Sequence, residues 1–417
     1  MILSFGEICG SEKQDEILAG LEAKINGVRA AEPLDTGIVI GAFDRLAGRI
    51  ETGEFDALID SLGLDDAARY KAQAVCMLRR ESLEYRLRRE LPGGMGGLEY
   101  EAPPFGLQGV RAFRLPLGTI FHIAAGNVDA LPAMALAEGL LTGNVNILKL
   151  PQADEGLSIK ILKALVDGEP ALAPYVHVFD TPSSDAAAML KMAQMCDAVS
   201  VWGGDEAVQA VRRMAPPGVK LIEWGHRFSF CYVTGNYAQH AAELRALAEH
   251  VAVTQQLLCS SCQAVYIDTE DQAVVQDFCR LFLPMLRDAF RVHAPKEIGM
   301  AASLTLRRLT DEVEAAITGG SAQSDSSDLM GRLPVRALPR AKLMDALRKR
   351  KGRLQTAGLI ADDPQDGIID ILTRAGVNRV TGAGEMSETF PGESHDGEYT
   401  LQRYTRVVNS RFMQNNQ

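Results

Sequence analysis

Short runs of β-branched residues alternate with amphipathic helix patterns between residues 118 and 224. This alternation is typical of right-handed βαβ units, whose strands pair in parallel because each helix carries the chain back across the sheet. The runs expected as strands are GTIFHIAAG, VNILKLP, YVHVFDT, AVSVWGG and VKLIEW. We therefore predict an α/β fold with a parallel sheet, and we expect ligands at the carboxyl ends of its strands.

The length of 417 residues suggests more than one domain. We expect an N-terminal region over 1–110, a first α/β domain over 111–230, a second over 231–385 and a C-terminal segment over 386–417. Within that segment, residues 398–411 alternate apolar and polar side chains, as a strand with one buried face does.

The formal net charge of −11 argues against a surface for nucleic acid or for anionic membranes. No apolar run approaches the roughly 18 residues of a membrane helix, and the first residues lack a signal-peptide pattern. Seven widely spread cysteines fit reduced thiols better than a disulfide framework. We expect a soluble cytoplasmic protein that binds no nucleic acid and has no membrane span.

Cys259 and Cys262 lie three residues apart between a helix pattern and the strand pattern QAVYID. A zinc site would need a second ligand pair, and no other C-x-x-C or H-x-x-H occurs in the sequence. A thioredoxin-like redox pair would begin a helix rather than follow one. Two interpretations of the pair stay open: buried core thiols, or a nucleophile with a neighbour.

Three loops at expected strand ends carry candidate binding residues. Gly203 and Gly204 would let the backbone approach a phosphate, although many strand-to-helix turns carry glycine for structural reasons alone. Lys149 ends the strand in LKLP, where it is either solvated or a donor to a ribose hydroxyl or phosphate. Asn127 follows the strand in HIAAGN, where its amide fits a turn, a cap or an oxyanion donor.

In this order, several segments resemble the aldehyde dehydrogenase superfamily, and within it the LuxC-type fatty acyl-CoA reductases of bacterial luminescence. These segments are HIAAGNVDALP, GNVNILKLP, VSVWGGDEAV, EWGHRFSF, QQLLCSSCQ and HDGEYTLQRYTRVV. The resemblance covers residues 111 to 411 approximately. It implies an aldehyde dehydrogenase-like fold: a nicotinamide cofactor-binding domain over 111–230, a catalytic domain over 231–385 and a C-terminal oligomerisation strand that makes a homo-oligomer.

The resemblance implies three catalytic residues. Cys259 matches the nucleophile, which leaves Cys262 as a bystander. Asn127 matches the amide that stabilises the oxyanion, with the Cys259 backbone N–H as its expected partner. Glu223 matches the general base of hydrolytic aldehyde dehydrogenases, a role that reduction of an acyl-enzyme does not require. Glu223 therefore either activates water or only orders the site.

The resemblance places the nicotinamide cofactor against Lys149, Gly203 and Gly204. We favour NADPH because Gln152, close after Lys149, carries no charge that would repel a 2′-phosphate. Asp154 lies near enough in sequence to keep NADH as the alternative. No metal is expected.

The implied reaction is NADPH-dependent reduction of an acyl thioester to an aldehyde through a Cys259 acyl-enzyme. The thioester is an acyl-CoA or a carrier-bound acyl group, and an acyl-activating enzyme is a candidate partner. Two alternatives remain: an NAD-dependent hydrolytic aldehyde dehydrogenase, and a non-catalytic scaffold for an acyl-activating partner. The sequence does not show what activates Cys259, because the carboxyl end of a helix disfavours a thiolate.

Overall fold

The chain divides into two compact units. Unit 1 comprises residues 1–62, 66–225 and 390–417, and unit 2 comprises residues 63–65 and 226–389. Unit 1 therefore joins segments from both ends of the chain, and unit 2 is inserted between them. The computed structural model describes residues 1–60, 67–98, 110–124, 131–151, 154, 156–256, 258–293, 328–329 and 333–411.

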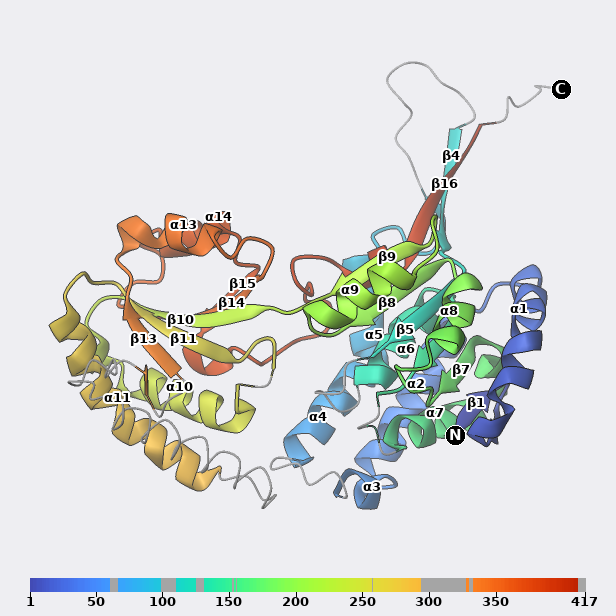
Figure 1. Ribbon diagram of the computed structural model, residues 1–417, viewed down its shortest axis with the longest axis horizontal. Coiled ribbons are helices and arrows are strands. Elements are labelled where there is room, and N and C mark those ends of the chain that lie inside the picture. Colours follow the sequence, from blue (N-terminus) through green and yellow to red (C-terminus); the bar gives the residue numbers. More distant parts are fainter. Residues whose placement is uncertain are drawn as a thin grey trace. The chain divides into compact units, whose positions relative to one another are not determined.

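Unit 1 is built on a seven-stranded sheet of order β2-β1-β7-β6-β5-β8-β9 (Figure 1). The five strands predicted from the sequence are all present and pair in parallel. They are β5 (Thr119–Ile123), β6 (Val145–Lys149), β7 (Val176–Phe179), β8 (Ala198–Trp202) and β9 (Lys220–Trp224). Parallel pairing brings their carboxyl ends to one edge, where the candidate loops lie.

Helices cover both faces of this sheet. One face packs against α2 (Thr36–Glu51), α6 (Leu131–Leu141) and α7 (Leu157–Gly168). The other packs against α1 (Gln14–Ala30), α8 (Ala186–Gln194) and α9 (Asp205–Met214). Because both faces are buried, the central strands read as nearly continuous apolar runs. The remaining helices of the N-terminal region are α3 (Asp56–Asp60), α4 (Ala67–Leu78) and α5 (Arg80–Glu90).

The N-terminus adds two strands that the sequence analysis did not predict. β1 (Ile2–Ser4) pairs antiparallel with β7 and with β2 (Glu7–Cys9). Each strand has three residues, which is too short for an alternating pattern to be recognised. Strand β1 nevertheless buries Ile2 and Leu3 completely, and β1 and β2 together extend the sheet beyond β7.

The C-terminal segment contributes a helix and a strand to unit 1. The helix is α15 (Thr400–Arg403), and the strand is β16 (Thr405–Arg411). A single strand over residues 398–411 was therefore the wrong expectation for residues 400–403. Leu401 and Tyr404 are fully buried three residues apart, and one helical turn places both on the same side.

A separate three-stranded sheet has the order β16-β4-β3. Its central strand is β4 (Val110–Pro116), flanked by β16 and by β3 (Gly96–Leu98), and all pairs are antiparallel. Strands β4 and β16 come from distant parts of the sequence and run side by side (Figure 1).

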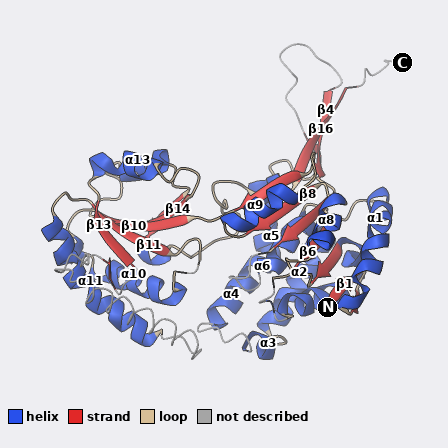
Figure 2. Ribbon diagram, viewed as in Figure 1, coloured by secondary structure: helices blue, strands red, loops and turns tan. Residues whose placement is uncertain are grey.

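Unit 2 contains a six-stranded sheet of order β12-β13-β11-β10-β14-β15 (Figure 2). All of its strand pairs are parallel except β12 with β13. One face packs against α10 (Ala241–Thr254) and α11 (Gln272–Val292), the other against α13 (Arg340–Arg348) and α14 (Ile368–Ala375). The strands are β10 (Phe228–Val233), β11 (Cys262–Ile267), β12 (Asp328–Leu329), β13 (Leu333–Ala337), β14 (Leu354–Ile360) and β15 (Arg379–Gly382).

Candidate active site

Cys259 lies in the turn between α10 and β11, at the amino ends of the strands of unit 2. It is exposed, whereas Cys262 is completely buried as the first residue of β11. Burial raises the pKa of the Cys262 thiol to about 12, and this thiol donates to the Ala264 carbonyl at 3.2 Å. Of the two cysteines, only Cys259 is therefore accessible to solvent.

The turn that carries Cys259 closes on itself. Gln255 and Gln256 have φ angles of 47° and 59°, so left-handed backbone ends α10. The Leu258 N–H donates to the Ser261 hydroxyl, and the Ser261 N–H donates back to the Leu258 carbonyl, both at 3.0 Å. The Gln256 side-chain amide donates to the Cys262 carbonyl at 3.0 Å. These bonds define the backbone on both sides of the thiol.

Two buried side chains tie the turn to neighbouring elements. The Ser229 hydroxyl, on β10, donates to the Cys259 carbonyl at 2.7 Å. The Nε2 atom of His250, on α10, accepts from the Cys262 backbone N–H at 3.2 Å. Neither residue was predicted from the sequence. A lone serine within the apolar run FSFCYV was the available signal, because a buried hydroxyl needs a partner.

Lys149 ends β6 and is only 3% exposed. Its Nζ donates to the Ser183 hydroxyl at 2.8 Å, and burial lowers the pKa of the ammonium group. Within the described ranges Lys149 forms no ion pair with a carboxylate. Asp154 instead accepts from the Ser158 backbone N–H at 3.1 Å, at the start of α7. A buried ammonium with a hydroxyl partner fits a ribose or phosphate oxygen.

Gly203 and Gly204 connect β8 to α9. A Cβ on Gly203 would lie 3.0 Å from the Ala207 Cβ, so this glycine lets the turn pack closely on its own helix. A Cβ on Gly204 would meet no described atom within 4 Å. Helix α9 begins with Asp205 and Glu206, whose charges oppose a phosphate at its amino end. The loop therefore offers open backbone rather than a phosphate cradle.

Glu223 lies on β9 and forms an ion pair with Arg212 of α9. The Arg212 Nε and Nη2 atoms donate to its two carboxylate oxygens at 2.5 and 2.6 Å. These hydrogen bonds hold the pKa of the Glu223 carboxyl below its usual value. A carboxylate with both oxygens bound in this way is a weak acceptor for a water proton.

Aromatic residues end β8 and β9 on the face that the C-terminal segment covers. Trp202 and Trp224 stack with ring centroids 5.2 Å apart. The His395 ring lies 4.9 Å from each of them. His395, in the segment HDGEY, therefore packs against Trp202, the residue that precedes the Gly203-Gly204 loop.

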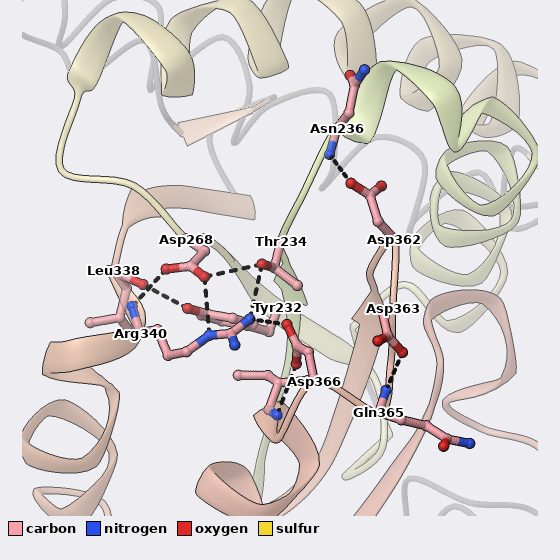
Figure 3. Close-up of polar contacts among 11 residues, drawn as sticks. Tyr232, Thr234, Asn236, Asp268, Leu338, Arg340, Asp362, Asp363, Gln365 and Asp366 are labelled. Carbon is pink, nitrogen blue, oxygen red and sulfur yellow. Dashed lines mark hydrogen bonds and ion pairs between the residues drawn. The ribbon is translucent and has the colours of Figure 1, made fainter.

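A polar network occupies the other edge of the unit 2 sheet, at the carboxyl ends of its strands (Figure 3). Arg340 pairs with Asp268 at 3.3 Å and with Asp366 at 2.6 Å. The Thr234 hydroxyl donates to Asp268 at 3.0 Å. Because these charges are mutually paired and Cys259 lies at the amino edge, we regard this network as a structural link between α13, α14 and the sheet.

Comparison with known proteins identifies the family. Residues 56–407 match the acyl-CoA reductase (LuxC) family. This chain belongs to the LuxC family. The resemblance to the LuxC-type reductases that the sequence shows is thereby confirmed.

Two relatives named long-chain acyl-protein thioester reductases show how far sequences diverge within the LuxC family. The protein of Photorhabdus laumondii is 24% identical over 321 residues, and one from Photobacterium leiognathi is 23% identical over 307 residues. The alignments cover 72% and 70% of this chain, but only 64% of the length of either relative.

Solved structures show which fold this LuxC-family chain adopts. An NAD-dependent aldehyde dehydrogenase from Sinorhizobium meliloti matches it with a TM-score of 0.76 and 12% sequence identity. The match covers 100% of this chain and 95% of that one. The predicted α/β, aldehyde dehydrogenase-like fold is therefore confirmed.

The structure groups the predicted site residues of this LuxC-family chain by unit. Lys149, the Gly203-Gly204 loop and Glu223 lie at or next to the carboxyl ends of strands in unit 1. Cys259 lies in unit 2, and Asn127 is outside the described residues. In the described part of the chain, no cluster of His, Cys, Asp and Glu suits a metal ion, and no helix is long and apolar enough to cross a membrane.

Proposed function

We propose that this chain reduces an acyl thioester to an aldehyde, with Cys259 as the nucleophile. The observation that carries the proposal is the contrast between two neighbouring thiols: Cys259 is exposed in a closed turn, and Cys262 is buried. Membership of the acyl-CoA reductase family supplies the reaction class. The names of the relatives, long-chain acyl-protein thioester reductases, favour a long acyl chain.

The Cys259 thiolate attacks the thioester carbonyl carbon, and the carrier thiol leaves with a proton. The product is a thioester between the acyl group and Cys259. We assign the side-chain amide of Asn127 and the backbone N–H of Cys259 to the oxyanion that forms in this step. A hydride, which carries two electrons and a proton, then adds to the carbonyl carbon of the acyl-enzyme and gives the anion of a thiohemiacetal. Cleavage of its carbon–sulfur bond releases the aldehyde and restores the Cys259 thiolate.

NADPH is the cofactor that we propose, and when bound it supplies the hydride for this reduction. Lys149 would hold a ribose or phosphate oxygen, because its ammonium is buried and has a hydroxyl partner in Ser183. The open backbone at Gly204 allows close approach on the same sheet edge. Asp154 accepts hydrogen bonds at the start of α7, which weakens the case for a carboxylate that repels a 2′-phosphate.

We assign Glu223 a structural role. Its two oxygens accept from Arg212, so removal of a proton from water would first require that pair to open. The acyl-enzyme would then persist until hydride arrives, as a reductase requires. This arrangement favours reduction over the hydrolytic alternative.

The decisive experiment offers the purified chain a long-chain acyl-CoA and NADPH, and follows both NADPH oxidation and trapped aldehyde. Parallel reactions use NADH, an acyl group on an activating partner enzyme, and aldehyde with NAD. We expect equal amounts of aldehyde formed and NADPH oxidised, and no turnover in Cys259→Ala. Acid production from aldehyde and NAD would identify a hydrolytic dehydrogenase, and inactivity with every thioester would leave the scaffold alternative.

A further inference from the structure

Ser229 contacts the backbone of the cysteine turn from the neighbouring strand. It is completely buried on β10, and its hydroxyl lies between two backbone groups. The hydroxyl donates to the Cys259 carbonyl at 2.7 Å and accepts from the Thr356 N–H of β14 at 3.1 Å. Both contacts lie within unit 2.

The direction of these two hydrogen bonds is fixed by chemistry. A backbone N–H can only donate and a carbonyl can only accept, so the serine proton must point at Cys259. Thr356 thus occupies an acceptor position of the hydroxyl, and the single O–H donor is committed to the turn. Rotation of the hydroxyl would leave this partly buried hydrogen bond unmade.

The sheet is irregular where Ser229 lies. Phe228 and Phe230 of β10 pair with Leu354 and Ala357 of β14. Between these pairs the chain advances by two residues on β10 and by three on β14. A similar shift affects the pairing with β11. Such bulges leave ladder groups unpaired and redirect side chains. Here the Ser229 hydroxyl takes the Thr356 N–H inside the irregular stretch of β14.

We propose that Ser229 is a positioning residue for the nucleophile: it fixes the peptide between Cys259 and Ser260 with its carbonyl turned into the sheet. In a trans peptide the N–H points the opposite way, so the same contact also sets the direction of the Ser260 N–H. The negative end of this peptide is therefore bound by a donor. A freely rotating carbonyl beside the sulfur would disfavour the thiolate.

The inference rests on the proposed function, because it matters for catalysis only if Cys259 attacks the thioester. It also concerns the end of α10, whose carbonyl groups give no help to a thiolate. The helix end is followed by left-handed backbone at Gln255 and Gln256, and the carbonyl of Cys259 itself is held by Ser229.

The test compares Ser229→Ala with Ser229→Thr, which keeps a hydroxyl, and with Ser260→Ala as the matched control. The Ser260 hydroxyl lies in the same turn and contacts Ser387 at 2.9 Å instead of the Cys259 peptide. Each folded protein is treated with iodoacetamide between about pH 6 and pH 9, and alkylation is measured on the separate peptides. Cys76, exposed in unit 1, is the internal reference for reagent and pH.

We expect Ser229→Ala to slow alkylation of Cys259 relative to Cys76 by roughly tenfold at neutral pH, with its pH profile moved upwards. Ser229→Thr should restore most of the rate, and Ser260→Ala should stay within about twofold of wild type. In the reductase assay, Ser229→Ala should lower kcat and leave KM nearly unchanged. Alkylation is measured without substrate, so it reports on Ser229 even if the chain fails to reduce thioesters.

An unchanged rate and pH profile in a stably folded Ser229→Ala would overturn the proposal. If Ser229→Ala does not fold, Ser229→Thr and Ser229→Val make the same comparison, because their side chains have nearly equal size. A folded Ser229→Val that alkylates as fast as Ser229→Thr would also overturn it. So would unfolding of both hydroxyl-free variants while Ser229→Thr folds, since the hydroxyl would then serve the fold and not the thiol.

Discussion

Arg212 binds both carboxylate oxygens of Glu223, at 2.5 and 2.6 Å, and thereby joins α9 to β9. We predict that Glu223→Gln keeps aldehyde formation within about twofold of wild type. The loss in unfolding free energy should be small, because the Arg212 side chain is 61% exposed and its ion pair is screened by water. Chemical denaturation and the NADPH assay measure the two quantities.

The same pair predicts that acyl-CoA without NADPH releases no fatty acid beyond the level of Cys259→Ala. Arg212→Ala is the informative companion, because it leaves the Glu223 carboxylate without its partner. Acid release by wild type that Glu223→Gln suppresses would assign Glu223 to water activation and contradict the structural role.

Cys259→Ala and Cys262→Ala should have opposite effects on thioester reduction. Cys259→Ala should abolish reduction and acyl-enzyme formation, followed as a mass increase on the peptide, while it still binds NADPH. Cys262→Ala should keep most activity and lose roughly 1 kcal/mol of stability, because it removes a buried sulfur. If Cys262→Ala is inactive and Cys259→Ala is active, the assignment of the nucleophile is wrong.

Asn127→Ala tests the oxyanion assignment, which concerns a residue outside the described ranges. Loss of one oxyanion donor typically costs about 10² to 10³ in kcat. We expect a decrease of that size with little change in KM for the acyl thioester. Steady-state kinetics of the variant decide the matter, and an effect confined to KM would indicate a binding or capping residue.

We predict that the chain self-associates through strand β16. The order β16-β4-β3 leaves one side of β16 without a partner strand in the described part of the chain, and Val407 on it is 51% exposed. Exposed strand edges are usually covered, so we expect a homodimer or larger oligomer by light scattering at about micromolar concentration. Val407→Lys should shift the oligomer towards the monomer.

The matched control for this variant is Ile369→Lys, which places the same charge on an exposed apolar residue of α14. It should leave the mass unchanged. A monomeric wild type would contradict the prediction.

We predict that the ion pairs of His240 make the unfolding free energy of unit 2 depend on pH. Its ring contacts Asp362 through Nε2 at 2.8 Å and Glu243 through Nδ1 at 2.5 Å. The hydrogen bond to Asp362, with help from Glu243, raises the pKa of His240 above 6.5. The stabilisation is therefore complete below about pH 6.5 and is lost as the pH rises through the raised pKa.

Denaturation of wild type and His240→Gln at about pH 6 and pH 9 measures this contribution. The variant should be less stable at the lower pH, and the two proteins should converge at the higher pH. An equal difference at both values would show that the histidine acts through packing.

The alternation of short apolar runs and helices allowed the central strands of unit 1 to be predicted, because burial on both faces makes β5 to β8 continuous in hydrophobicity. Strand β1 and helix α15 escaped prediction for a different reason. Each has only three or four residues, and tertiary contacts decide their conformation. In α15, the Leu401 N–H donates to the Glu90 carboxylate, 311 residues away in sequence, at 2.9 Å.

The same limit applies to the candidate site. The resemblance supplied Cys259, but the partners of the predicted residues lie on other elements. Arg212 is eleven residues from Glu223, and Ser229 is thirty residues from Cys259. No periodic pattern reports such pairs, since they depend on how strands and helices are brought together. A single polar residue within an apolar strand, such as Ser229, was the one local sign.

The insertion of unit 2 between β9 and the C-terminal segment has a consequence for how the chain is made. During synthesis, residues 226–389 leave the ribosome before residues 390–411, so unit 2 can fold while unit 1 is still incomplete. Until Leu401 and Tyr404 emerge, the sites that they fill in unit 1 stay open to water and to other nascent chains. Translational arrest after unit 2 would thus expose a hydrophobic gap in the half of the protein that was made first.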